Sequence, residues 1–194
     1  MSSLTRLTRR NFLAGTAVGG ATLLVAGSRV FGANERVDVG VIGCGGRGTG
    51  HVGWAKSSGG QVVAVCDPDV GRMASAANKA DGNPKQYRDL RELLDDKSVD
   101  AVAIAMPNHW HALGTIMACE AGKDVYCEKP ASHSIWEGRK MVEAARKYKR
   151  IVQIGTQQRS DPAFITLREK IRKRELGKIQ YMQASHPQDM AGWP

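Results

Sequence analysis

The sequence predicts an α/β protein whose core is a doubly wound parallel sheet. Three observations predict this fold class. Short apolar strand candidates alternate with helix-like stretches, the run Val99–Met106 is apolar almost throughout, and a glycine-rich segment follows the first strand candidate. Alternation of this kind favours parallel strands joined by helical crossovers. A strand that is apolar on both sides is typical of a sheet covered by helices on both faces.

The first half of the alternation runs to residue 95. Turn-forming residues separate its last two helices, and the final helix carries Leu90, Leu93 and Leu94 on one side. The predicted elements are a strand at Val37–Ile42, a helix at Arg47–Ser57, a strand at Gln61–Cys66, a helix at Pro68–Ala80, a turn at Asp81–Pro84 and a short helix at Arg88–Asp95.

The second half continues in the same rhythm, with Gly122 as the expected C-terminal cap of its first helix. The predicted elements are a strand at Val99–Met106, a helix at His109–Ala121, a strand at Lys123–Cys127, a helix at Ile135–Tyr148 and a strand at Ile151–Ile154.

The character of the chain changes after residue 156. We expect a basic helix at Pro162–Leu176 and one exposed strand at Lys178–Ser185. A lone strand has no partner to bury its face. Residues 157–194 therefore read as the beginning of a truncated α+β C-terminal domain.

The glycine-rich run has the spacing Gly43-x-Gly45-x-x-Gly48, with Gly46 and Arg47 between the second and third glycines. The first glycine allows a tight turn, the second lets the backbone approach a pyrophosphate, and the third lets helix and strand pack closely. Amide groups at the start of the following helix then face the phosphate charge. The run predicts a Rossmann-type dinucleotide-binding domain over residues 36–156.

Asp67 ends the second strand about 20 residues beyond the glycines, where a carboxylate accepts hydrogen bonds from the ribose hydroxyls of the adenosine. It would repel a 2′-phosphate, so we expect NAD as the cofactor. Arg72 is close enough in sequence to bind that phosphate, which keeps NADP as the alternative.

Bulk composition describes an ordinary globular protein, with 42% hydrophobic and 24% charged residues. The formal charge of +9 raises the question of nucleic acid. Many cations between Arg146 and Lys178 are mixed with acidic residues on expected helix exteriors, and no groove-entering or stacking element is visible. No apolar run is long enough for a membrane span. We therefore expect neither a nucleic-acid partner nor a stable membrane span.

The four cysteines form no C-x-x-C pair and show no metal-ligand spacing, so no metal site is predicted. Cys44 and Cys66 follow neighbouring strands, and a disulfide between them is one interpretation. Buried thiols are the favoured one, because small apolar residues suit these positions.

Several further motifs coincide with the glycine run. The full set is Gly43–Gly48, Cys66–Pro68, Met106–His111, Ala121–Pro130 and Gly155–Arg159. With these motifs the chain resembles the glucose–fructose oxidoreductase / inositol dehydrogenase / MocA (Gfo/Idh/MocA) family from residue 36 to about residue 185. The resemblance implies an NAD(P)-dependent oxidoreductase that acts on a sugar, cyclitol or related polyol by hydride transfer. An NAD-dependent glycosidase of the same family and a non-catalytic dinucleotide-binding fragment are the alternatives.

The resemblance implies that Lys129 is catalytic and moves the hydroxyl proton, while Glu128 and Pro130 shape the nicotinamide end of the site. A lysine at the carboxyl end of a parallel strand also lies in the ligand crevice of such sheets, where we expect it to be partly buried and to stabilise alkoxide charge. The predicted cofactor-binding residues are Gly43, Gly45, Gly46, Arg47, Gly48, Asp67, Pro107, Asn108, His109, Glu128, Lys129, Gln157 and Arg159.

For two further residues close to this set in the sequence, two interpretations of the role are open. His111 belongs either to the site or to the helix surface, and Trp110 lines the nicotinamide pocket or packs in the core. The resemblance also implies a catalytic Asp and His, together with an oligomerisation surface, beyond residue 194. The chain is then a fragment of a full oxidoreductase or a stand-alone module.

The leading segment, residues 1–33, resembles a twin-arginine export signal, as in exported members of the family. Arg9 and Arg10 precede Phe12-Leu13, and a mildly apolar stretch extends to Ala26. Cleavage near residues 26–28 and near residues 31–33 are both compatible with the small residues there. We expect export to the periplasm by the twin-arginine machinery; an uncleaved amphipathic N-terminus is the alternative.

The leader interpretation predicts that a reporter fused after residue 36 is exported. Replacing both arginines, Arg9→Lys with Arg10→Lys, should abolish export, because the pair is the feature that the machinery reads. Cell fractionation of the reporter measures the outcome. A matched Arg29→Lys variant should be exported normally, and undiminished export of the double variant would remove the assignment.

Overall fold

The structure is a computed structural model that describes residues 36–182. It divides into two units, Met1–Ile154 and Gly155–Pro194, each of which is described by itself. The predicted export signal lies outside the described residues, as do the last three residues of the predicted strand Lys178–Ser185.

The first unit is built on a six-stranded sheet with the order β3-β2-β1-β4-β5-β6. Its paired strands run parallel, as in the pairs of β1 with β2 and with β4. The chain moves outward from β1 to β3 and then returns to the other side of β1, so the winding direction reverses between β1 and β4. The strands are β1 Asp38–Ile42, β2 Gln61–Cys66, β3 Lys85–Tyr87, β4 Ala101–Ile104, β5 Asp124–Glu128 and β6 Val152–Gly155.

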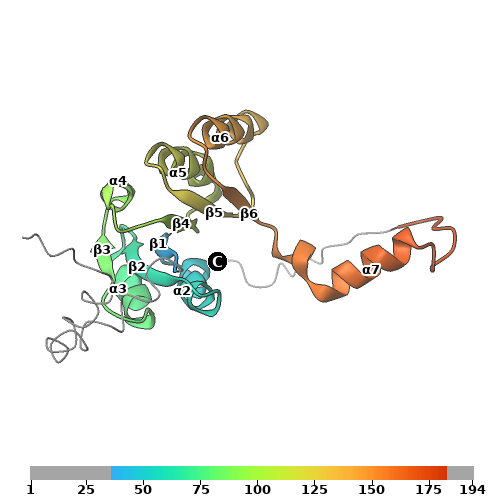
Figure 1. Cartoon of the computed structure of the whole chain (residues 1–194), viewed down its shortest axis with the longest axis horizontal. Helices are drawn as coiled ribbons and strands as arrows, with labels where there is room; N and C mark the ends of the chain where they lie inside the picture. Colours follow the sequence, from blue (N-terminus) through green and yellow to red (C-terminus); the bar gives the residue numbers. More distant parts are fainter. Residues whose placement is uncertain (1–35, 183–194) are drawn as a thin grey trace, which may run out of the picture. The chain divides into compact units, whose positions relative to one another are not determined.

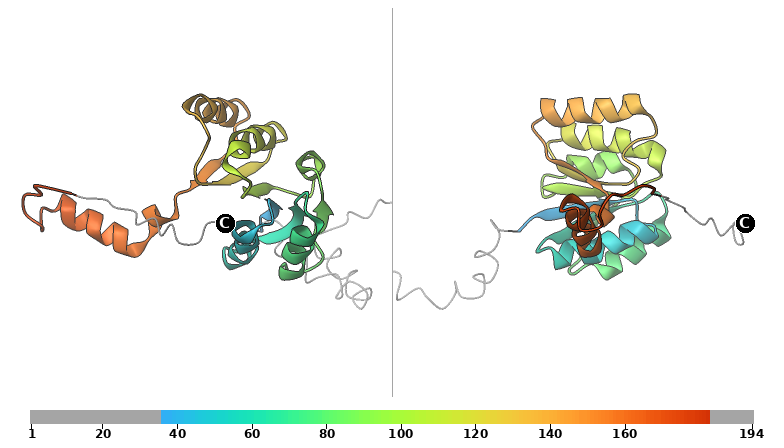
Figure 2. Two further views of the ribbon diagram at one scale, coloured as in Figure 1. Left: turned by 180° about the vertical axis from the view of Figure 1, so that it is seen from behind. Right: turned by 90° about the vertical axis from the view of Figure 1, so that its right-hand side faces the viewer.

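Helices cover both faces of this sheet (Figures 1 and 2). Two helices lie on one face, α2 Gly46–Ser57 and α3 Val70–Lys79. Three lie on the other face, α4 Leu90–Asp95, α5 Asn108–Glu120 and α6 Ile135–Lys147. The predicted doubly wound α/β fold is confirmed.

Consecutive side chains of the central strands enter different cores, because side chains alternate across a strand. Ile42 and Ile104 pack with the layer of α4, α5 and α6. Val41, Val65 and Ala103 pack with α2 and α3. All five are at most 2% exposed, which explains why these strands read as continuous apolar runs in the sequence.

The four cysteines are free and buried, as the favoured prediction had it. Burial raises the pKa of the Cys44 thiol to about 11 and that of Cys66 to about 12, with the nearby Asp67 carboxylate adding to both. The disulfide alternative is not realised, and such thiols react poorly at neutral pH.

The sequence did not predict β3. It has only three residues, two of them exposed, so it carries no apolar pattern. The predicted strand at Lys178–Ser185 is wrong over its described part, because Lys178–Met182 is exposed and pairs with no described strand.

The second unit begins with the short helix η1, Gln157–Ser160, followed by α7, Pro162–Arg172. The predicted helix at Pro162–Leu176 ends four residues earlier than expected, and Arg174 and Gly177 adopt positive φ angles just beyond it. Within residues 36–182, no helix has both the length and the apolar character to cross a membrane.

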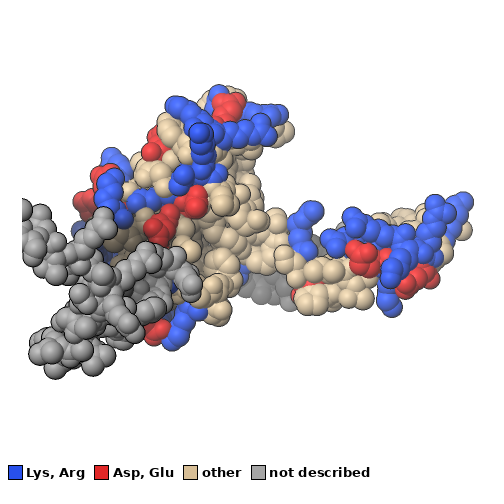
Figure 3. Space-filling model, viewed as in Figure 1, with Lys and Arg blue, Asp and Glu red and all other residues tan. Residues whose placement is uncertain are grey.

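Basic side chains gather over α6 and α7 on the face shown in Figure 3, with acidic side chains among them. Arg168 and Arg172 both pair with Glu169, at 3.1 and 3.6 Å, and Lys140 pairs with Glu143 at 2.7 Å. The excess of basic residues is thus spread over solvated, ion-paired helix faces in this part of the chain.

Asp96 follows α4 and fixes the edge of the sheet. Its carboxylate accepts hydrogen bonds from Lys85 Nζ and Tyr87 Oη of β3, at 2.9 and 3.0 Å, and from Ser98 N at 2.9 Å. Its backbone carbonyl accepts from the buried Lys123 Nζ at 2.8 Å. Burial alone would raise the pKa of Asp96, but the hydrogen bonds from Ser98, Lys85 and Tyr87 outweigh it and hold the pKa well below its ordinary value.

Asp96→Asn should therefore destabilise the first unit by about 1–3 kcal/mol at neutral pH, because it removes a charged acceptor with several donors. A carboxyl with a depressed pKa stabilises the fold above its unfolded pKa of about 3.9, and this contribution disappears as the pH falls through the folded value. Urea unfolding across acidic pH should show a shallower acid loss in the variant than in the wild type.

Asp95→Asn is the matched control, since the neighbouring Asp95 is exposed and makes no ion pair among the described residues. It should change the free energy of unfolding little. Equal effects of the two substitutions would contradict the role of Asp96.

Candidate nucleotide-binding site

A cavity of about 770 Å³ lies at the carboxyl ends of β1, β2 and β4. Ile42 and Gly43 line it from the end of β1, and Ala105 and Met106 line it from the end of β4. Between these two strands the winding of the sheet reverses, which is where open α/β sheets bind ligands. The cavity therefore lies where the topology of the sheet predicts a ligand site.

The glycine loop lies at the centre of that edge, and two of its glycines are fixed by packing. Gly43 has a φ of +87°, and a Cβ there would lie 2.7 Å from the carbonyl oxygen of Ala105. A Cβ on Gly48 would lie 1.7 Å from the carbonyl oxygen of Gly43. The predicted tight turn at the first glycine and close helix–strand approach at the third are confirmed.

The other two glycines, Gly45 and Gly46, face open space, since a Cβ on either meets no atom within 4 Å. Gly45 is the N-cap of α2 and offers no side-chain oxygen, and the first turn of the helix contains no acidic residue. The amides of this turn are therefore left to an external acceptor. This geometry fits the diphosphate of a dinucleotide.

Asp67 is buried at the end of β2 and contacts the loop directly. One carboxylate oxygen, Oδ2, accepts from Cys44 N at 2.7 Å, and the other, Oδ1, accepts from Asp69 N at 2.8 Å. Each oxygen retains a further lone pair for a ribose hydroxyl. The sequence did not reveal this second role, in which Asp67 holds the glycine loop in place.

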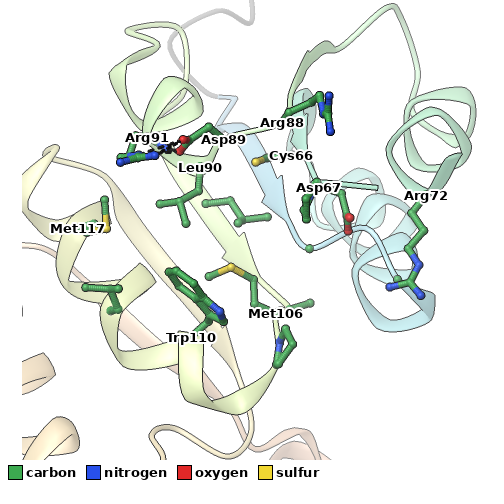
Figure 4. A pocket seen from close by; sticks show the side chains of 17 residues that line it. Cys66, Asp67, Arg72, Arg88, Asp89, Leu90, Arg91, Met106, Trp110 and Met117 are labelled. Carbon is green, nitrogen blue, oxygen red and sulfur yellow. Dashed lines mark hydrogen bonds and ion pairs between the residues drawn. The ribbon is translucent and has the colours of Figure 1, made fainter. Parts of the chain in front are cut away.

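Three arginines line the outer part of the cavity, in which Figure 4 shows Asp67 between Arg72 and Arg88. Arg91 pairs with Asp89, whose pKa this side-chain hydrogen bond lowers to about 2. Arg72 lies 3.6 Å from Asp69, and Arg88 makes no ion pair within the described residues. The charge near Asp67 is therefore partly uncompensated and positive.

The opposite wall of the cavity is apolar and includes Leu90, Trp110 and Met117 (Figure 4). Trp110 is 41% exposed and lines the cavity, so it does not pack in the core. The wall offers a surface on which a flat ring can pack.

A second, smaller hollow of about 470 Å³ shares Ala105 and Met106 with the first. It is the part of the site that holds Lys129. Its remaining lining residues are Arg47, Asn108, His111, Glu128, Lys129 and Pro130.

Glu128 organises this hollow from the end of β5, where its side chain is only 5% exposed. Arg47 Nε donates to it at 2.7 Å, Lys129 N donates at 3.2 Å, and His51 Nε2 lies 3.1 Å away. Burial favours the neutral acid, but the hydrogen bonds from Arg47 and Lys129 prevail and lower the pKa of Glu128. Burial is also the main cause that lowers the pKa of His51. Glu128 is thus a carboxylate that joins α2 to the segment carrying Lys129.

The structure brings most of the predicted residues to the two hollows, but not all of them. Pro107 lines the larger hollow and Asn108 the smaller. His109 does not reach either: one helical step turns it toward the groove between α5 and α6, where it lies with Trp136. Lys129 is exposed in the turn that follows β5, so the expectation of partial burial is wrong.

Gln157 and Arg159 lie in η1 of the second unit. That unit is described by itself, and their assignment to the site stays a prediction.

His111 is the residue that the sequence reading left undecided. It is 2% exposed and belongs to the smaller hollow, not to the helix surface. The signal was present in the helical period: His111, Thr115 and Cys119 lie four residues apart along α5, and all three are buried.

Residues 37–156 match the family model described as "Oxidoreductase family, NAD-binding Rossmann fold", GFO_IDH_MocA. The chain belongs to the Gfo/Idh/MocA family. The match coincides with the sheet, the glycine loop and the segment that ends in Pro130, so the expected resemblance is confirmed over residues 37–156.

Relatives and solved structures agree with this membership. The inositol 2-dehydrogenase of Salmonella typhimurium is 35% identical over 150 residues, covering 76% of this chain and 45% of the relative. The crystal structure of myo-inositol 2-dehydrogenase from Lactobacillus plantarum has a TM-score of 0.69 at 27% identity, covering 74% of this chain and 43% of that one.

A third comparison is the WlbA dehydrogenase from Chromobacterium violaceum, solved with NADH and UDP-GlcNAcA. Its TM-score is 0.69 at 25% identity, over 74% of this chain and 42% of that one. The chain spans less than half the length of each of these three proteins.

The loop geometry predicts that Gly48→Ala destabilises the first unit severely, on the order of 3 kcal/mol or more, because backbone must move to admit the Cβ. Gly46→Ala is the matched control: its Cβ enters open space, and alanine is the better helix former by about 1 kcal/mol. Thermal or urea unfolding compares them. Similar stability of the two variants would contradict the packing role of Gly48.

Proposed function

We propose that this chain binds NAD with its diphosphate on the first turn of α2. The observation that carries the proposal is the uncapped helix start at Gly45 and Gly46, which faces open space beside the winding reversal of the sheet. The adenosine would occupy the larger hollow, with its ribose on Asp67, and the nicotinamide the smaller one, near Lys129. Membership of an NAD-binding family supports the same choice.

NAD is proposed over NADP because the Asp67 carboxylate would repel a 2′-phosphate. Arg72 and Arg88 oppose this preference, since both guanidinium groups line the same hollow and can bind a phosphate. NADP is therefore expected to bind more weakly than NAD, without being excluded altogether.

The reaction proposed for the full-length protein is oxidation of a hydroxyl group on a sugar, cyclitol or related polyol. Bound NAD would supply the hydride acceptor for the carbon that bears the hydroxyl. As the free amine, Lys129 Nζ takes the hydroxyl proton while the C–O bond becomes a carbonyl, and the ammonium that results stabilises alkoxide character on that oxygen. Relatives named as inositol dehydrogenases support a polyol substrate.

We propose further that the protein is exported to the periplasm through its twin-arginine leader. A dinucleotide enzyme suits this route, because the machinery carries folded proteins, and the cofactor can be loaded before export. The paired arginines at Arg9 and Arg10 support this proposal.

Titration calorimetry of the folded chain should show one NAD bound, and NADP weaker by about tenfold, or about 1.4 kcal/mol. Lys129→Ala should leave NAD affinity nearly unchanged, because Lys129 is assigned to proton transfer. In the full-length protein the same substitution should abolish polyol-dependent NADH formation, followed by absorbance, whereas Lys147→Ala on the exterior of α6 should not.

Three results would change the proposal. A folded chain that binds neither nucleotide would refute it, and tighter binding of NADP would reverse the cofactor assignment. Sugar turnover without accumulation of NADH would favour the glycosidase reaction.

A further inference from the structure

The imidazole of His111 bridges the two chain segments that form the smaller hollow. Its Nδ1 lies 2.5 Å from the carbonyl oxygen of Pro130, which follows β5. Its Nε2 lies 2.7 Å from the carbonyl oxygen of Met106, which follows β4. One buried ring thus touches both the segment of Lys129 and the wall shared by the two hollows.

Both partners of His111 are carbonyl oxygens, which accept hydrogen bonds and have no proton to donate. Each short contact therefore needs an N–H group on the ring. Neutral imidazole has only one N–H, and its other nitrogen would direct a lone pair at a carbonyl oxygen. Only the imidazolium satisfies both contacts.

We propose that His111 is a positioning residue for Lys129: as an imidazolium it donates to the carbonyls of Pro130 and Met106 and fixes the Lys129 turn against the end of β4. The inference deepens the proposed function, since it concerns the lysine assigned to proton transfer there. Lys129 then lies between two fixed neighbours, Glu128 held by Arg47 and Pro130 held by His111.

Some charged groups around His111 favour a positive charge on its ring, and others oppose it. Arg47 from α2 and Lys129 from the turn after β5 line the same hollow and oppose a further cation, as does the positive N-terminal end of α5 itself. The Glu128 carboxylate favours it. Arg47 is paired with Glu128 and its side chain is 56% exposed, and Lys129 is exposed too, so water screens both. The two carbonyl dipoles contact the ring directly and are not screened in this way.

The first test is ¹⁵N NMR of the histidine side chains in the intact chain without nucleotide. The His111 signals are identified by their disappearance in His111→Gln. We expect both ring nitrogens to carry protons at neutral pH, with the chemical shifts of an imidazolium. One protonated and one bare nitrogen, as in a neutral ring, would overturn the proposal.

The second test compares His111→Gln, which can donate to one carbonyl at a time, with His111→Phe, which donates to neither. In the full-length protein we expect kcat to fall on the order of 10- to 100-fold, more in the Phe variant, because Lys129 is misplaced. NAD affinity should stay within about twofold, and KM should change little. Unchanged kcat in a folded His111→Phe variant would overturn the positioning role.

His133→Gln is the matched control, because His133 is exposed and lies outside both hollows. It should leave the His111 signals and kcat unchanged. Failure of the proposed function is seen separately, as absence of NAD binding to the wild-type chain, whereas failure of this inference is seen in the ring signals whether or not a nucleotide binds.

Discussion

The close approach of helix α2 to the first strand is the constraint on which the rest of the structure depends. Gly48 packs so tightly over Gly43 that no side chain fits between them. This contact fixes the start of α2 above the reversal between β1 and β4, and it aims the first amides of the helix into the larger hollow. The same placement brings Arg47, in the first turn, to the carboxylate of Glu128 at 2.7 Å. Diphosphate site and Lys129 segment are therefore positioned by one helix.

Polar groups that hold the loops of the first unit also belong to the proposed site. Asp67 binds Cys44 N and has lone pairs left for a ribose. Glu128 accepts hydrogen bonds from Arg47 Nε and from the backbone amide of Lys129. His111 joins Met106 and Pro130. In each case a buried side chain connects segments that are distant in the sequence, so the geometry of the site is established by the fold before any nucleotide arrives.

The sequence predicted the fold well for those elements that are determined by residues close together in the chain. Glycine spacing and apolar runs identified β1, β2 and β4, because a strand buried on both faces leaves a pattern in neighbouring residues. β3 was not predicted, because its three residues bury little surface and leave no apolar pattern. The motifs predicted the site. The bridge that His111 makes depends on the carbonyl oxygens of residues 106 and 130, and no pattern of neighbouring residues in the sequence predicts these contacts. His109 was assigned to the site because it follows a strand at a position where members of the family line the cofactor groove, but one step of helical rotation turns it toward α6.

Lys129 is exposed where it lines the smaller hollow. In the proposed reaction, the described residues would therefore supply a charge beside the nicotinamide but little surface that touches the remaining hydroxyl groups of a polyol. They would fix the chemistry of that reaction more than its choice among polyols.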